Sequence, residues 1–339
     1  MKKRIEWLDM LRGIAMICVI AAHPEGIPED IDCWIYSFHM PLFFMISGAT
    51  FRYERYLSLK ECVYDQIRKL LVPYAIMYIV CIPFWYINKI IFAGDQFNPI
   101  SLIIGFFTAH QSIGVMPNGA LWFLPTLFVS AVVFWWMFDL SEKRRIDLAA
   151  SVSICFLFGF CLSSFVEGKM PLHLNCVPMI IVFYYFGYLL MQSYNKYILL
   201  FSNSDLLIVT VVLLLSIGSF AAFYNGKINV HDNEYNNILL ALISSVFISL
   251  AIAIICIKMP VVHILSFIGQ NTIIFLGYHI PIMRFFENSP WTKSFSEHHS
   301  LWLSGICILI LIPISFFITN YIPILAGRIP PNNRVSTKR

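Results

Sequence analysis

Two residues with useful chemistry stand near the N-terminus, in the stretch LDMLRGIAMICVIAAHPEG at positions 8–26. Arg12 and His23 are 11 residues apart, and 11 helical steps of 100° return to within about 20° of the same face, about 16 Å further along the axis. A guanidinium stays charged and suits an anionic ligand, whereas an imidazole titrates near neutral pH and suits proton transfer. The alternative for either residue alone is that its side chain reaches headgroups or water.

Three further apolar segments carry polar side chains that a buried site can use. WIYSFHMPLFFMISGATF (34–51) holds a histidine and a serine, NGALWFLPTLF (118–128) a tryptophan, and IGQNTIIFLGYHIPIM (268–283) an amide and a histidine. A single histidine on an apolar face is usually structural, but ionisable groups in several membrane segments indicate a functional site. The expected pocket or oxyanion residues are His39, Ser47, Trp122, Asn271 and His279.

The composition indicates that these residues lie in a membrane protein. Of 339 residues, 59% are hydrophobic and 12% are charged, whereas soluble domains carry about 25% charged residues. A net charge of +4 is too small to suggest nucleic acid as a partner. The nine cysteines show no CxxC spacing, so we interpret them as small core residues and expect no metal site.

Charge-free runs of about spanning length recur along the chain. The sequence predicts an all-α polytopic membrane helical bundle with about ten transmembrane helices, in one membrane-embedded domain over 1–339. The stretch 98–109 is apolar but short and is expected to be re-entrant or interfacial. The predicted helices cover 8–25, 34–51, 68–91, 119–138, 147–165, 173–192, 205–223, 237–257, 262–283 and 301–325.

The basic residues give this bundle an orientation. With the N-terminus inside, the inner segments hold 17 Lys and Arg residues and the outer segments hold 5, with Arg12 completing the 23. Such segregation is typical of the positive-inside rule, and a wrong helix count would scramble it. We therefore expect both termini to be cytoplasmic in an integral protein of a bacterial inner or plasma membrane. The outer loops 24–33 and 224–236 are rich in acidic and amide side chains.

At these residues the chain resembles the integral-membrane acyltransferase-3 family of O-acyltransferases. The first segment is similar to the family's R-x10-H motif through Arg12 and His23, and FHMPLFFMISG at 38–48 matches equally well. Weaker similarities are IRKLLVPY at 67–74, LWFL at 121–124 and YHIP at 278–281. The resemblance implies transfer of an acetyl or other short acyl group from acyl-CoA to a hydroxyl of a sugar, glycolipid or polysaccharide of the cell envelope. Acetyl-CoA would be a co-substrate, with no tightly bound cofactor.

The residue chemistry assigns roles within that reaction. His23 is expected to be the general base or, less favoured, a transiently acylated nucleophile. Arg12 suits a phosphate-bearing donor and needs a carboxylate partner, which Asp9 provides one turn earlier. Arg68 and Lys69 are further donor-binding candidates, although basic residues there also fit ordinary topology.

Two other classes of membrane protein compete with this interpretation. A secondary transporter or flippase of a polar glycan-type substrate also needs intramembrane histidine, arginine and broken helices. The chain lacks the two-half symmetry typical of such transporters, and a polysaccharide polymerase usually has larger outer loops. We consider a homodimer possible.

Overall fold

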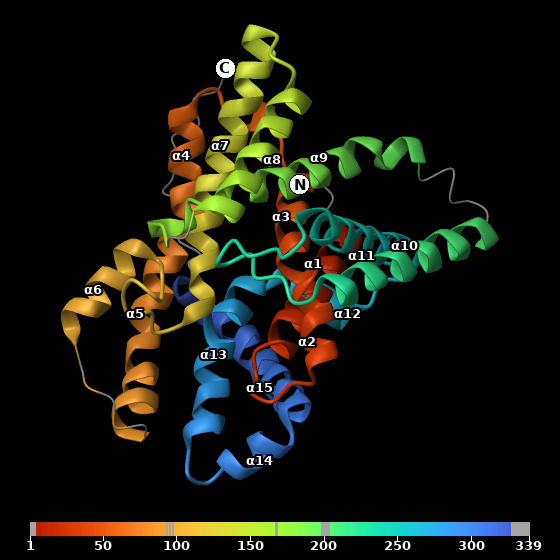
Figure 1. The fold of residues 1–339 in the computed structure, drawn as a ribbon. Coiled ribbons are helices and arrows are strands. Elements are labelled where there is room, and N and C mark those ends of the chain that lie inside the picture. Colours follow the sequence, from red (N-terminus) through yellow and green to blue (C-terminus); the bar gives the residue numbers. More distant parts are fainter. Residues whose placement is uncertain are drawn as a thin grey trace.

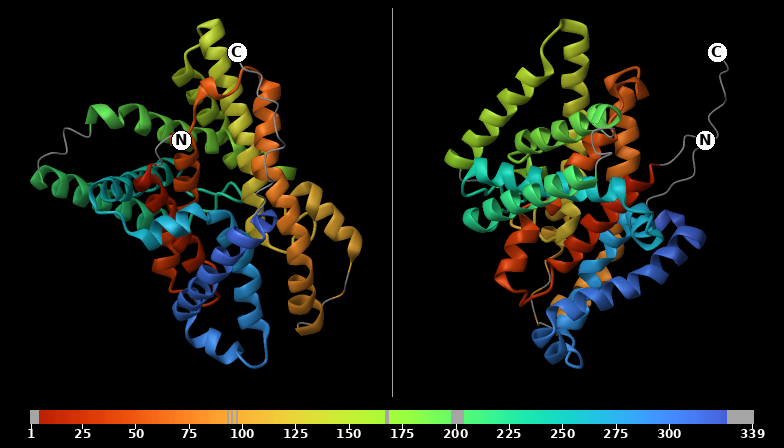
Figure 2. Two further views of the ribbon diagram at one scale, coloured as in Figure 1. Left: turned by 180° about the vertical axis from the view of Figure 1, so that it is seen from behind. Right: turned by 90° about the vertical axis from the view of Figure 1, so that its right-hand side faces the viewer.

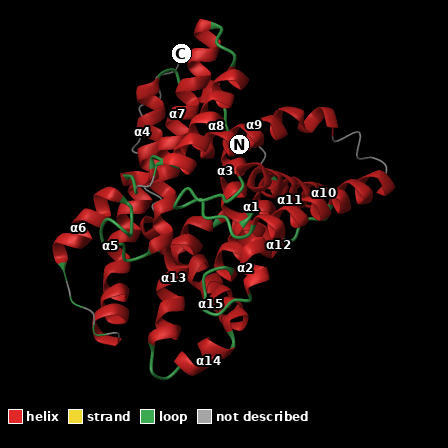
Figure 3. Ribbon diagram, viewed as in Figure 1, coloured by secondary structure: helices red, strands yellow, loops and turns green. Residues whose placement is uncertain are grey.

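The computed structural model describes residues 5–92, 94, 96, 98–166, 169–197 and 204–326, and the fold is helical throughout these segments. Figures 1 and 3 show the arrangement, in which no strand is drawn and residues 229 and 234 form an isolated antiparallel bridge. The predicted all-α polytopic bundle is confirmed. The helices are α1 Glu6–Ala21, α2 Glu29–Tyr36, α3 His39–Ala49, η1 Tyr53–Arg55, α4 Leu59–Gln66, η2 Ile67–Leu71, α5 Val72–Tyr86, η3 Ile87–Phe92, α6 Pro99–Thr108, η4 Gly119–Trp122, α7 Phe123–Arg144, α8 Leu148–Phe165, η5 Pro171–His173, α9 Val177–Tyr197, α10 Ser204–Asn225, α11 Ile238–Lys258, α12 His263–Gln270, α13 Thr272–Asn288, α14 Lys293–His298, α15 Ser300–Tyr321 and η7 Pro323–Ala326.

Seven helical runs among the described residues are long and apolar enough to cross a membrane. They match seven of the ten predicted spans, and the short apolar helix α6 falls where a non-spanning segment was expected. The sidedness of the loops and termini stays a prediction, and residues 1–4 and 327–339, which carry the terminal basic residues, lie outside the described residues. The seven runs are Leu59–Phe92, Gly119–Arg144, Leu148–Phe165, Pro171–Tyr194, Asp205–Asn225, Ile238–Lys258 and Ser300–Tyr321.

The other three predicted spans are short or broken, and here the predicted bounds are wrong. The first helix ends at Ala21 rather than at residue 25, because Pro24 disfavours helical backbone at the residue before it. With 16 residues it is about 24 Å long, short of the hydrocarbon thickness of about 30 Å. The segment 34–51 divides into α2 and α3, and 262–283 divides at Asn271 into α12 and α13.

These broken helices lie inside the bundle and contact one another. α1 packs against α3, α12 and α13, while α5 and α6 stand at the periphery (Figures 1 and 2). Irregular backbone at membrane depth is tolerated only where it is buried in protein or lines a water-filled cavity. The predicted site residues on these helices therefore lie where the fold admits polar groups.

Glycines allow two of these helix pairs to approach closely. A Cβ on Gly48 of α3 would lie 1.8 Å from the carbonyl oxygen of Tyr184 in α9, and one on Gly187 would lie 1.7 Å from that of Met45. Gly269 of α12 meets the Asp9 carbonyl of α1 in the same way, at 1.8 Å. Such distances leave no room for a side chain, so the backbones of α3 and α9 are in direct contact.

We predict that Gly48→Ala will destabilise the protein, because the new methyl group meets backbone that cannot turn away. Overpacking of this kind costs about 1–3 kcal/mol, which will lower the midpoint of thermal unfolding of the detergent-solubilised protein. Gly305→Ala in α15 is the matched control, since a Cβ there meets no atom within 4 Å. Equal midpoints for the two variants would show that α3 and α9 are not in contact.

Candidate functional site

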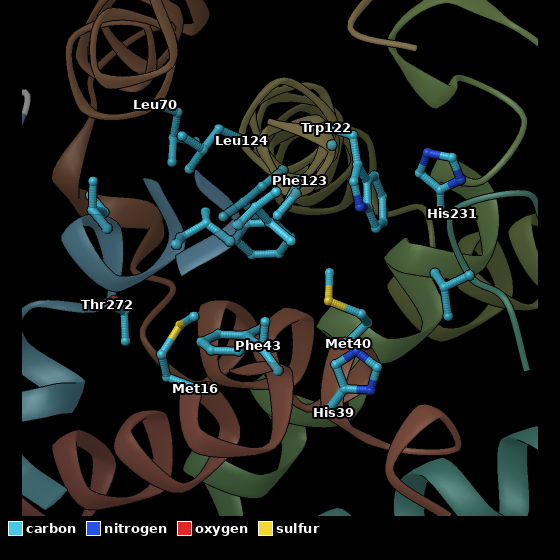
Figure 4. A pocket seen from close by; sticks show the side chains of 18 of the residues that line it. Met16, His39, Met40, Phe43, Leu70, Trp122, Phe123, Leu124, His231 and Thr272 are labelled. Carbon is cyan, nitrogen blue, oxygen red and sulfur yellow. The ribbon is translucent and has the colours of Figure 1, made fainter. Parts of the chain in front are cut away.

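One cavity of about 960 Å³ brings together side chains from α1, α3, the α4–α5 run, α7, α13 and the loop 226–237. Figure 4 shows part of its wall, with Met16, Phe43 and Thr272 on one side of the opening and Trp122 and His231 on another. Of the predicted residues, the cavity is lined by Arg12, His23, His39, Ser47, Lys69 and Trp122. Arg68, Asn271 and His279 are not among its lining residues.

The charges along the cavity divide into two groups. Arg12, Arg52, Arg55 and Lys69 line one part, and this basic end comprises the start of α1, the segment after α3 and the run before α5. The other part, the mixed end, holds both signs from the loop after α1, the loop 226–237 and the second half of α13. Its charged lining residues include Glu25, Lys227, Asp232 and Arg284.

His23 lies just beyond the end of α1, and its ring takes part in the helix cap. Nδ1 is 2.6 Å from the carbonyl oxygen of Val19, while the backbone N–H of His23 bonds instead to Ile20. A carbonyl oxygen only accepts hydrogen bonds, so Nδ1 carries the proton and Nε2 carries the lone pair. The cap thus holds His23 in a tautomer that can accept a proton at Nε2.

Two other histidines use the same bond to a carbonyl four residues earlier. Nδ1 of His39 lies 2.8 Å from Ile35 O at the break between α2 and α3, and Nδ1 of His279 lies 2.8 Å from Phe275 O. The His279 ring meets the His23 ring edge-on, with centroids 4.9 Å apart. Its Nε2 is buried without a hydrogen-bond partner in the described part of the chain. His279 therefore packs directly against His23.

Arg12 is held beside Asp9 on the same helix. Nη1 of Arg12 lies 3.3 Å from Oδ1 of Asp9, and Gln270 in α12 donates to the other carboxylate oxygen at 3.4 Å. Asp9 is only 1% exposed, and a buried carboxylate of this kind needs a cation close by. Arg12 keeps 28% of its side chain exposed, so it can neutralise Asp9 and still face the cavity.

The other cations of the basic end share one carboxylate. Lys69 and Arg55 both pair with Asp65, which also accepts from the Tyr56 hydroxyl. Arg68 instead has its guanidinium 5.9 Å from the ring of Tyr64. Of the predicted Arg68–Lys69 pair, the lysine is thus the residue placed on the cavity.

Of the remaining predicted residues, Ser47 lies on the cavity wall and Asn271 stabilises the backbone behind it. Ser47 lines the cavity but donates to the carbonyl of Phe43 at 2.9 Å. Asn271 stands at the α12–α13 break, where it donates to Phe267 O and accepts from Thr319. It supports the backbone there, and the next residue, Thr272, lines the cavity.

Sequence reasoning recognised the outer loops of the mixed end as polar but missed how their charged residues pair. Arg284 pairs with Glu25 at 2.5 Å and with Glu287 at 2.7 Å, and Lys227 pairs with Asp32 at 2.5 Å. Arg284 and Glu25 are remote from each other in sequence, and so are Lys227 and Asp32. Only Arg284 and Glu287 form a local pair, one helical turn apart on α13. The loop 224–236 was recognised as polar, but its single histidine, which lines the cavity, gave no spacing to interpret.

Metal ligation has no support in the described residues. No group of three or more His, Cys, Asp and Glu side chains among them is arranged to hold a metal ion. All nine cysteines have free thiols, and eight are in helices. What the cavity offers instead is a set of cations, histidines with lone pairs and an indole.

A cavity of this kind, in a bundle of apolar helices, defines an integral membrane protein with a polar internal site. A family model described as an acyltransferase domain matches residues 5–320. The chain therefore belongs to the acyltransferase-3 family and is a membrane acyltransferase. Searches of curated proteins and of solved structures found no match.

One buried amide holds the wall of the site together. Pro281 removes the helical N–H that would bond to the Gly277 carbonyl. Nδ2 of Asn118 reaches that oxygen at 2.8 Å, and the Asn118 Oδ1 accepts from the backbone of Ala120 at 2.9 Å. Asn118 thereby joins the start of η4, and the tryptophan at its end, to α13.

We predict that Asn118→Ala will lower the thermal unfolding midpoint, because it removes the amide donor and leaves the buried Gly277 carbonyl only the weak thiol donor of Cys81. The expected loss is about 1–3 kcal/mol. Asn320→Ala is the control, since that exposed amide donates only to the carbonyl four residues earlier. An unchanged midpoint for Asn118→Ala would contradict the proposed role of the amide.

Proposed function

We propose that this acyltransferase moves an acetyl or other short acyl group from acyl-CoA to a hydroxyl of a sugar or glycan. The observation that carries the proposal is a single cavity that has cations at one end, both signs of charge at the other, and His23 on its wall. A cationic end suits the phosphates of CoA. At the mixed end most cations pair with nearby carboxylates, and this suits a neutral hydroxyl-rich acceptor.

The donor would enter at the basic end. CoA phosphates would contact Arg12 and Lys69, with Arg52 and Arg55 on the same part of the wall. The slender pantetheine arm would follow the cavity and carry the thioester toward His23. Arg68 would reach the donor only by leaving the ring of Tyr64.

The transfer step would use Nε2 of His23 as the general base. Nε2 takes the proton from the acceptor hydroxyl while the hydroxyl oxygen attacks the thioester carbonyl carbon. The resulting tetrahedral intermediate collapses, the C–S bond breaks, and the CoA thiolate takes the proton back from the imidazolium. Of the cavity-lining candidates for a donor to the oxyanion, Trp122 offers its indole N–H. His39 and Ser47 would have to give up their bonds to Ile35 O and Phe43 O before donating. His279 would orient His23 through the ring contact.

Family membership favours this reaction over transport or flipping of a glycan substrate. The acceptor class can be tested by incubating membranes containing the protein with radiolabelled acetyl-CoA and base-treated envelope glycan from the producing cells. We expect label in the glycan that mild base releases as acetate. Absence of base-labile label in every glycan fraction would overturn the proposed function.

We predict that His23→Ala will lower the rate of acetyl transfer by about 10²- to 10⁴-fold, the usual contribution of general-base catalysis. The exposed His263→Ala, in α12 and away from the cavity, is the matched control and should retain the wild-type rate. Both variants should bind a non-hydrolysable acetyl-CoA analogue as the wild type does. Near-normal transfer by well-folded His23→Ala would show that His23 is not the base.

The donor end gives a separate prediction. Lys69→Ala and Arg12→Lys should each weaken binding of the same analogue by about tenfold or more, because each loses a charge-assisted contact to phosphate. Lys60→Ala is the control, since this exposed lysine at the start of α4 does not line the cavity. Calorimetric titration gives the affinities. Unchanged affinity in both variants would show that the basic end does not bind CoA.

A further inference from the structure

The loop 226–237 at the mixed end holds a histidine that the proposed reaction leaves without a role. His231 lines the cavity, and its Nδ1 lies 3.1 Å from Oδ1 of Asp232. The other carboxylate oxygen of Asp232 accepts from Nδ2 of Asn229 at 2.7 Å. The carboxylate is thus fixed by its neighbours and sits against one nitrogen of the imidazole.

The opposite ring nitrogen lacks a partner. Nε2 of His231 is buried and makes no hydrogen bond to any described residue, although it belongs to a side chain on the cavity wall. Burial lowers the pKa of His231 in this loop, against the opposing effect of Asp232. The ring is therefore neutral at neutral pH, and with Nδ1–H toward the carboxylate its Nε2 offers a lone pair.

Unpaired polar atoms are concentrated in this loop. Among the described residues, ten buried side-chain nitrogen and oxygen atoms lack a hydrogen-bond partner, and five of them belong to residues 231–235. One of the five, Oδ1 of Asp232, has the 3.1 Å contact with Nδ1 of His231 instead. Native proteins leave few such atoms without a hydrogen bond, so a cluster of them indicates a place that a polar ligand or water occupies. Of these residues, His231 and Asp232 line the cavity, where a ligand can supply such a bond, whereas Asn233 and Tyr235 do not line it.

The side chain of His231 is not what anchors the loop. The backbone carbonyl of His231 lies 2.8 Å from Nδ1 of His173 and accepts from the thiol of Cys176 at 3.5 Å. Residues 229 and 234 also exchange two backbone hydrogen bonds, of 2.8 and 2.9 Å. All of these bonds survive when the imidazole is replaced, so a role of the ring can be separated from a role of the loop.

An aromatic surface lies beside this lone pair. The rings of Trp122 and His231 are 5.1 Å apart and nearly perpendicular, and both line the cavity. Figure 4 shows them next to each other. An indole face beside a hydrogen-bond acceptor suits a pyranose ring, whose C–H face is apolar while its hydroxyls donate.

The charges nearby favour a neutral ring over an anionic one. Arg284 is neutralised by Glu25 and Glu287, and Lys227 by Asp32. The carboxylate of Asp232 would repel an anion directly. Because Arg284 and Lys227 are both paired, this part of the mixed end offers a ligand hydrogen bonds and an apolar face.

We propose that His231 and Trp122 form the acceptor subsite, which binds a neutral sugar ring through the indole face and a hydrogen bond from a sugar hydroxyl to Nε2 of His231. The bound hydroxyl is not the one that is acylated, so His231 binds and orients the acceptor while His23 takes the proton. Asp232 is a positioning residue that holds the imidazole tautomer. This inference rests on the proposed function.

The test measures acetyl transfer to the base-treated envelope glycan of the producing cells, with both substrates varied. His231→Ala should raise KM for the glycan about 10- to 100-fold, the range for losing one hydrogen bond in a buried site. KM for acetyl-CoA should stay unchanged. His231→Gln should recover part of the loss, because its amide can replace the hydrogen bond, and Asp232→Asn should show a smaller rise.

Glu234→Ala in the same loop is the control, since that exposed side chain does not line the cavity and its pairing with residue 229 is through the backbone. An unchanged glycan KM in His231→Ala and His231→Gln would overturn the subsite and would mean that Nε2 only holds water. Should His231→Ala fail to fold, the glutamine variant alone decides. Absence of transfer by the wild type would instead overturn the proposed function.

Discussion

The structure depends on how backbone carbonyls are satisfied where helices break inside an apolar bundle. Water is scarce there, so side-chain donors complete carbonyls that lose their usual N–H partner four residues later. Val19 O and Ile35 O keep only a longer bond from the N–H three residues later. His23 donates to Val19 O at the end of α1, His39 to Ile35 O at the end of α2, and Asn118 to Gly277 O beside Pro281. These bonds allow short helices to end in the interior, and the cavity forms around those ends.

The same bonds have a chemical consequence for the histidines. A ring that donates from Nδ1 to a fixed carbonyl has its lone pair on Nε2 and cannot rotate without losing the cap. In His23 the hydrogen bond that caps the helix is therefore also the bond that fixes a tautomer able to act as a base. The contact with His279, which is itself tied to Phe275, limits the ring further.

Much of this could be predicted from the sequence because hydropathy and local spacing are properties of contiguous residues. The all-α membrane class, seven long helices and the short α6 follow from apolar runs. The Arg12–His23 spacing led to two residues that line one cavity, although His23 lies beyond the helix rather than on it. The family resemblance, carried mainly by that motif, agrees with the match over residues 5–320.

The tertiary structure decided which polar groups meet. Arg68 and Lys69 are adjacent in sequence, yet only Lys69 lines the cavity, because successive residues of a helix point in different directions. His231 reaches Trp122 across 108 intervening residues, and its side chain gave no local pattern. The sequence alone determined the lipid environment and the helical class, and it pointed to Arg12 and His23 as candidate site residues. Only the packing of distant segments determined the cavity, its two ends and the tautomers of its histidines, because these depend on through-space contacts that no local periodicity encodes.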